Sequence, residues 1–181
     1  MDNTTQTTLT PEEISALTAL LAKLQPGLLP LPVFLEIARI NVLSIVEIVP
    51  LRMHEGKVQI LLLQRGADDK HWPSMMHFPG VVVLANDELG SYLSAFRRIV
   101  HNELADVELA GSPHYFQTYF RKTRRGAENS TVFYVEVAGE PTVGQFYDIN
   151  ALPANLVPDE AGVIQGAARA FRDSQRSAQT V

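Results

Sequence analysis

The segment HFPGVVVLANDELGSYLSAFRRIVHNELAD, residues 77–106, leads from a short apolar stretch into the most regular helical pattern of the chain. Apolar residues recur along one face of this pattern, at Leu89, Leu93, Phe96, Ile99, Val100 and Leu104. The other faces carry polar side chains, at Arg97, Arg98, His101 and Asn102. We therefore predict a helix with one buried face and one face equipped for chemistry.

Two strands are predicted upstream of this helix. Val42–Met53 is rich in β-branched residues, and Val58–Gln64 is an almost continuous run of Ile and Leu. The intervening His54–Lys57 contains a glycine suited to the positive φ of a tight hairpin turn. A continuous apolar strand is covered on both faces, so we expect a mixed sheet between helices, an α/β (α+β) fold.

Further strands are predicted downstream, at Tyr115–Lys122, at Ser130–Val137 and near Gln145–Tyr147. The basic segment Thr123–Asn129 is the expected turn between the first two. A final helix is expected after Pro158, with acidic residues in its first turn facing the helix dipole, and the polar tail from Ser174 is expected to fray.

Residues 1–40 form a predicted helical extension, and residues 41–181 form the main domain. Thr10-Pro11-Glu12-Glu13 has the form of a capping box, and an apolar helical stripe follows before Gln25-Pro26-Gly27 ends the helix. A second short helix is expected at Val33–Ile40. The extension is interpreted as a brace packed on the main domain, with a homodimer contact as the alternative.

The composition narrows the class of protein. The chain has 181 residues, 46% hydrophobic and 19% charged, which suits one well-formed core. The net charge of -5 argues against polymeric nucleic acid as a partner, and the absence of cysteine excludes disulfides and thiolate chemistry. Met1–Thr8 lacks a secretory pattern, and no apolar run is long enough for a membrane span, so a cytoplasmic protein is expected.

The order of these features resembles the Nudix hydrolase family over roughly residues 41–172. The resemblance is carried by Leu61–Arg65, the loop with Trp72, Phe78-Pro79-Gly80 and the helix after it, together with Gln145–Ile149 near the chain end. In the family signature, carboxylates three and four residues apart share one helical face and hold hard divalent cations through oxygen. This sequence departs from that signature, because Val81, Ile99, Asn102 and Ala105 replace a Gly, two glutamates and a closing Gly.

The resemblance implies a set of site residues. Glu103 would bind Mg²⁺ or Mn²⁺, with Asn102, Asp87 and Glu88 as further ligands. Arg98 would orient the carboxylate loop, and Glu160 would serve as a general base. The candidates for substrate binding are Arg65, Trp72, Gly80 and Tyr147.

Each candidate has a plainer structural alternative. Glu103 would simply pair with a basic neighbour, and Glu160 would serve the helix dipole, which is the favoured interpretation for it. Arg65 would anchor a carboxylate, and Trp72 and Tyr147 would close the core. The basic residues Arg121, Lys122, Arg124 and Arg125 are interpreted as a solvated hairpin tip rather than a phosphate site, and His71, His77 and His101 as surface or core residues.

Two functions follow from the resemblance. The leading hypothesis is a Nudix-type hydrolase that cleaves a nucleoside diphosphate linked to another moiety by metal-assisted attack of water. The alternative is a catalytically inactive Nudix-like module that binds a nucleotide or nucleotide sugar. Both imply a small nucleotide-type ligand.

Overall fold

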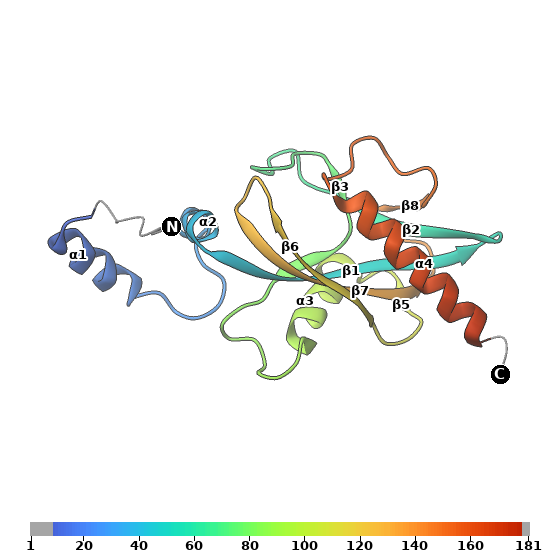
Figure 1. The fold of residues 1–181 in the computed structure, drawn as a ribbon, viewed down its shortest axis with the longest axis horizontal. Helices are drawn as coiled ribbons and strands as arrows, with labels where there is room; N and C mark the ends of the chain where they lie inside the picture. The colour runs from blue at the N-terminus through green and yellow to red at the C-terminus, as the bar shows by residue number, and fades with distance from the viewer. Residues whose placement is uncertain (1–8, 179–181) are drawn as a thin grey trace, which may run out of the picture.

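A computed structural model describes residues 9–178 of the chain, so the expectation for Met1–Thr8 lies outside the described residues. Within this range, a mixed sheet of eight strands lies between helices α3 and α4, as predicted (Figure 1). The strands are β1 Val42–His54, β2 Lys57–Gln64, β3 Met76–His77, β4 Gly80–Val82, β5 Glu108–Leu109, β6 His114–Lys122, β7 Ala127–Ala138 and β8 Gln145–Asp148. The helices are α1 Pro11–Leu21, α2 Leu31–Ile40, α3 Leu93–Glu103 and α4 Glu160–Ala178.

Strands β1 and β7 form the centre of the sheet and run parallel, with Val42 opposite Ala127 and Leu51 opposite Glu136. The hairpin of β1 and β2 turns at Glu55 and Gly56, which both have positive φ, as a two-residue hairpin turn requires. On the outer sides, β8 pairs with β2 and β6 pairs with β7, both antiparallel. This arrangement brings the middle of β1 next to both β4 and β7.

The alternation of side chains along β1 divides the core into two layers. Val49 and Leu51 face α4, whereas Val46 and Ile48 face α3. Because side chains in a strand alternate, Glu47 lies on the same face as Val49, toward α4. The sheet therefore buries an acidic residue on its α4 face, where Glu47 is only 5% exposed.

Several sequence predictions about element boundaries were wrong. Helix α3 begins at Leu93 rather than Leu89, which is 94% exposed, because Gly90 adopts a φ of +82° and interrupts the helical path. The turn between β6 and β7 is shorter than expected, since β7 already begins at Ala127. The tail from Ser174, expected to fray, continues α4 as far as Ala178.

The N-terminal helices differ in how they pack. Helix α2 buries Ala38 against Leu43 and Ile45, and a Cβ on Gly126 would come within 1.9 Å of the Ala38 carbonyl oxygen. Helix α1 begins at the predicted capping box of Thr10 and Glu13, but none of its residues is buried. Figure 1 shows α1 set apart from the sheet. Within residues 9–178, each helix is too short or too polar to span a lipid bilayer.

Candidate ligand site

A network of buried charges ties β1, β6 and β7 together on the α4 face. The Arg121 guanidinium donates to Glu47 at 2.7 Å and to Glu128 at 3.1 Å. Arg125 reaches Glu128 from the turn with two further hydrogen bonds, at 2.7 and 2.9 Å, and the Tyr119 hydroxyl donates to Glu47 at 3.0 Å. Glu128 is fully buried, so its charge depends on these two arginines for compensation.

This network overturns one sequence interpretation. Arg121 and Arg125 do not belong to a solvated hairpin tip, because their side chains are only 13% and 18% exposed and are paired with buried carboxylates. Lys122 and Arg124 do lie on the exposed side of the hairpin. The alternation of side chains along β6 explains the difference between Arg121 and Lys122. Arg121 and Tyr119 point to one face of the strand, and Lys122 points to the other.

A small cavity of about 60 Å³ lies beside this network at the start of α4. Its walls are Ile45, Glu47, Arg65, Trp72, His77, Phe78, Gly80, Arg121, Arg125, Val157 and Glu160. An adjoining hollow of about 200 Å³ shares Trp72, Arg121 and Val157 with the cavity. The two spaces together form a cleft with an aromatic wall and an interior lined by arginine and glutamate side chains, which we call the α4-face cleft.

Glu160 stands at the first residue of α4, as the sequence predicts, but its carboxyl group is turned into the cavity. It is 4% exposed and accepts a hydrogen bond from the Phe78 backbone N–H at 3.3 Å. Burial, and then the charge of Glu47, raise the pKa of Glu160 well above its usual range. The pKa of Glu47 is raised as well, chiefly by burial. The interior of the cleft therefore holds two carboxyl groups, Glu47 and Glu160, whose ionisation is opposed by burial.

Arg65 and Trp72 form the outer wall of the cleft. The Arg65 Nε donates to Asp69 at 2.8 Å, so Arg65 does anchor a carboxylate, and its guanidinium lies 5.4 Å from the centre of the Trp72 ring. Arg125 lies 5.6 Å from the same ring. Asp69 also accepts from the backbone N–H groups of His71 and Trp72, and these hydrogen bonds lower its pKa to about 2.

His77 contributes a neutral ring to the cleft. Burial, and then the charge of Arg65, lower its pKa to about 4. Its Nδ1 lies 2.9 Å from the Phe78 carbonyl oxygen. At neutral pH, therefore, this histidine adds no positive charge to the site.

The predicted metal ligands are not brought together. Both oxygens of Asp87 are bonded to the Arg98 guanidinium, which also donates to the Val82 carbonyl, and Asp87 accepts from the Leu84 N–H as well. Hydrogen bonds from Arg98 keep the pKa of Asp87 low. Glu88 and Asn102 are exposed. Arg98 thus holds the loop before α3 to the helix.

Glu103 lies beside the cleft but apart from other carboxylates. It accepts from the Gly80 N–H and faces Arg65, while burial raises its pKa to about 7. Between residues 9 and 178, no three His, Asp or Glu side chains are grouped so that they could hold a metal ion. The residues present do not fit Mg²⁺ or Mn²⁺.

The structure therefore divides the predicted site residues. Arg65, Trp72, Gly80 and Glu160 line the cleft, and Glu103 borders it through Gly80. Tyr147 packs against the α4-side core from β8 instead. The sequence reasoning did not identify Glu47, Tyr119 or Glu128. Glu47, an acid inside an apolar strand, was the available signal, since such a residue needs a buried partner.

Comparison with solved structures shows the Nudix fold. A mutT/nudix family protein from Listeria innocua matches with a TM-score of 0.55 and 18% identity, over 72% of this chain and 94% of the other. The NUDIX domain of Shewanella oneidensis NrtR, in complex with ADP ribose, matches with a TM-score of 0.52 and 15% identity, over 85% and 97%. A C. elegans Ap4A hydrolase binary complex matches at 0.53 and 13%, over 73% and 99%.

These comparisons establish the fold alone. The activity has to be inferred from the chemistry of the site. Another structure, of Shewanella oneidensis NrtR, has a longer chain, and the present chain spans 63% of it, which is less than two thirds. No family model and no curated protein matches the sequence. The chain therefore has the fold of the Nudix hydrolases, as its sequence pattern predicted.

Proposed function

We propose that this chain is a Nudix-fold module that binds a nucleoside diphosphate ligand of the ADP-ribose type without a carboxylate-bound divalent metal. The observation that carries the proposal is the contrast between two groups. The carboxylates expected to bind metal are dispersed or paired, whereas Arg65, Arg121 and Arg125 gather around the Trp72 wall of the α4-face cleft.

The chemistry of the cleft suits such a ligand. Guanidinium groups recognise phosphate oxygens by charge-assisted hydrogen bonds, and an indole ring provides a flat face for a base. The inner cavity of about 60 Å³ admits only a few oxygen atoms, so the rest of the ligand would occupy the adjoining 200 Å³ hollow beside Trp72. The neighbouring fold bound to ADP ribose supports the choice of ligand class.

Metal-assisted hydrolysis is the second candidate, and Glu160 is the observation that favours it. This carboxyl is buried inside the cleft, close to Glu47, and burial raises its pKa, a shift often found in groups that transfer protons. For hydrolysis, Glu103 would still have to ionise and bind the cation with few further carboxylate ligands. The geometry supports the binding module better for this reason.

Calorimetry with ADP-ribose in EDTA and in Mg²⁺ tests the proposal, combined with chromatography for released AMP. We expect binding of equal affinity in both buffers and no AMP. Arg65→Gln should weaken binding by about 10-fold or more, because a charge-assisted bond is lost. Arg39→Gln, which alters an exposed arginine on α2, should leave affinity unchanged and serves as the matched control.

Two outcomes would contradict the proposal. Failure of the folded protein to bind ADP-ribose at millimolar concentration would rule out this ligand class. Release of AMP that needs Mg²⁺ and disappears in Glu103→Gln would instead establish the hydrolase.

A further inference from the structure

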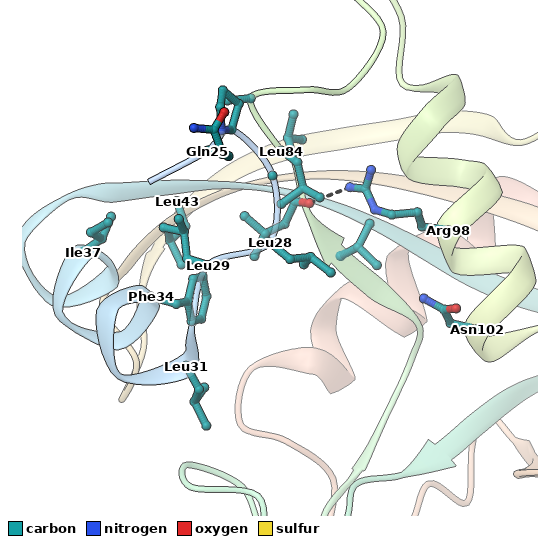
Figure 2. A pocket seen from close by; sticks show the side chains of 16 residues that line it. Gln25, Leu28, Leu29, Leu31, Phe34, Ile37, Leu43, Leu84, Arg98 and Asn102 are labelled. Carbon is teal, nitrogen blue, oxygen red and sulfur yellow. Dashed lines mark hydrogen bonds between the residues drawn. The ribbon is translucent and has the colours of Figure 1, made fainter. Parts of the chain in front are cut away.

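A further hollow of the described structure lies outside the α4-face cleft. It measures about 540 Å³ and runs between the N-terminal extension, β4 and the loop after β4. Figure 2 shows Leu28, Leu29, Phe34 and Ile37 of the extension facing it, with Leu84, Arg98 and Asn102 on the opposite wall. We call it the extension groove. Its lining is mostly aliphatic, and its one guanidinium, Arg98, is engaged with Asp87 and Val82.

Helix α1 carries the complementary feature, an apolar stripe that residues 9–178 leave largely exposed. Ile14, Leu17, Leu20 and Leu21 fall on one side of the helix and are 44 to 60% exposed. Isolated helices of eleven residues are marginal in water even when well capped. A surface that covers the apolar stripe would therefore stabilise the helix from Pro11 to Leu21.

We propose that α1 of one copy docks into the extension groove of a second copy, and that the exchange is reciprocal, giving a two-fold homodimer. Two complementary surfaces on one chain satisfy each other in both directions under such a two-fold exchange. The chain also concentrates exposed aliphatic residues in this region, since Leu28 is 86% exposed, Leu31 62% and Ile40 71%. Docking of α1 into the extension groove would cover these residues and the α1 stripe in a single interface.

The size of the exchange agrees with a stable dimer. A helix of eleven residues is about 16 Å long and about 10 to 12 Å across, so half of its circumference covers roughly 280 Å². The groove contributes a similar area, and two reciprocal contacts bury roughly 1,100 Å² in total, just above the ~1,000 Å² expected of a biological interface. A single contact would bury half as much. The area thus favours a second copy over one foreign helix of this size.

Light scattering on the full chain during size-exclusion chromatography tests the proposal. We expect the wild-type chain at twice its mass of 20.0 kDa. Leu17→Glu with Leu20→Glu should raise the dimer dissociation constant about 100-fold or more, because the change removes both contacts at once. Ser15→Glu with Ala19→Glu adds the same charge on the opposite side of α1 and should remain dimeric.

A mixing experiment tests the pairing of helix with groove. Leu28→Glu with Leu31→Glu disables the groove through exposed residues, so the fold should persist and the near-ultraviolet circular dichroism should not change. The stripe variant and the groove variant should each be monomeric alone and should associate when mixed, more weakly than the wild type, because only one intact helix then meets one intact groove.

Three results would overturn the proposal. The wild-type chain could be monomeric at micromolar concentration, with the stripe variant melting at a lower temperature, which would show that α1 covers the groove of its own chain. It could be monomeric with an unchanged melting temperature, which would assign the groove to another partner. Finally, a groove variant that remains dimeric by itself would show that α1 contacts the α1 of the second copy and not the groove.

Discussion

The raised pKa of Glu103 has a direct consequence for stability. Burial holds this pKa at about 7, against 4.5 for an unperturbed glutamate. Between these values the folded state keeps a proton that the unfolded state has lost, so the unfolding free energy falls as pH rises from about 4.5 through 7. At 1.36 kcal/mol per pKa unit, the ionised Glu103 costs about 3 kcal/mol above pH 8.

The variant Glu103→Gln removes this cost. Glutamine keeps an acceptor for the Gly80 N–H and carries no charge. We expect the variant and the wild type to be equally stable near pH 4.5, and the variant to be about 3 kcal/mol more stable above pH 8. The other buried acids, Glu47 and Glu160, are present in both proteins, so their contributions cancel in the difference.

Urea unfolding at pH 5, 6, 7 and 8 measures this difference, provided that the slope with denaturant stays the same in both proteins. Glu88→Gln, which neutralises an exposed glutamate in the loop before α3, is the matched control and should show little change. A stability difference for Glu103→Gln that stays constant within about 0.5 kcal/mol across this range would refute the reasoning.

Three further variants test other parts of the structure by denaturant unfolding. Arg121→Met should lower the unfolding free energy by about 3 to 5 kcal/mol, because buried carboxylates lose their partner. Arg52→Met, whose partner Glu140 is 77% exposed, should lower it by about 1 kcal/mol or less. Equal losses of stability in the two variants would contradict this reasoning. Gly126→Ala should cost more than Gly56→Ala, because the first Cβ would meet α2 and the second meets nothing within 4 Å. Ile99→Glu should cost at least about 3 kcal/mol at pH 7, since this position has no exposure; a stable Ile99→Glu protein would show that the core opens there.

Much of the fold followed from local patterns in the sequence. The strand hairpin at Glu55 and Gly56 and the capping box at Thr10 were predictable because turns and caps depend on residues only a few positions apart. The start of α3 was not, because the apolar periodicity continues back to Leu89 although Gly90 breaks the helix. Periodicity records which residues suit a helix face, and the backbone at one glycine decides where the helix begins.

The site was harder to predict because its charges come from distant parts of the chain. Glu47 is 74 positions from Arg121 and 113 from Glu160, and only the parallel pairing of β1 with β7 and the packing of α4 bring them together. Arg121 and Lys122 are neighbours of the same charge, yet the Arg121 side chain is only 13% exposed whereas Lys122 is exposed. A basic run in a sequence therefore does not reveal which of its members turns inward.

The altered signature makes physical sense once α3 is in place. Ile99 stands where the Nudix pattern has its first helical glutamate, and it packs with Val46 and Ile48 in the core below the sheet. Arg98 and Asp87 keep the loop attached to the helix without any metal, because their ion pair is complete in itself. Retention of this pair therefore reports that the loop and helix are held together, and it carries no information about catalysis. The chemistry of this chain has to be sought where arginines and buried carboxyl groups meet, on the α4 face around Glu160.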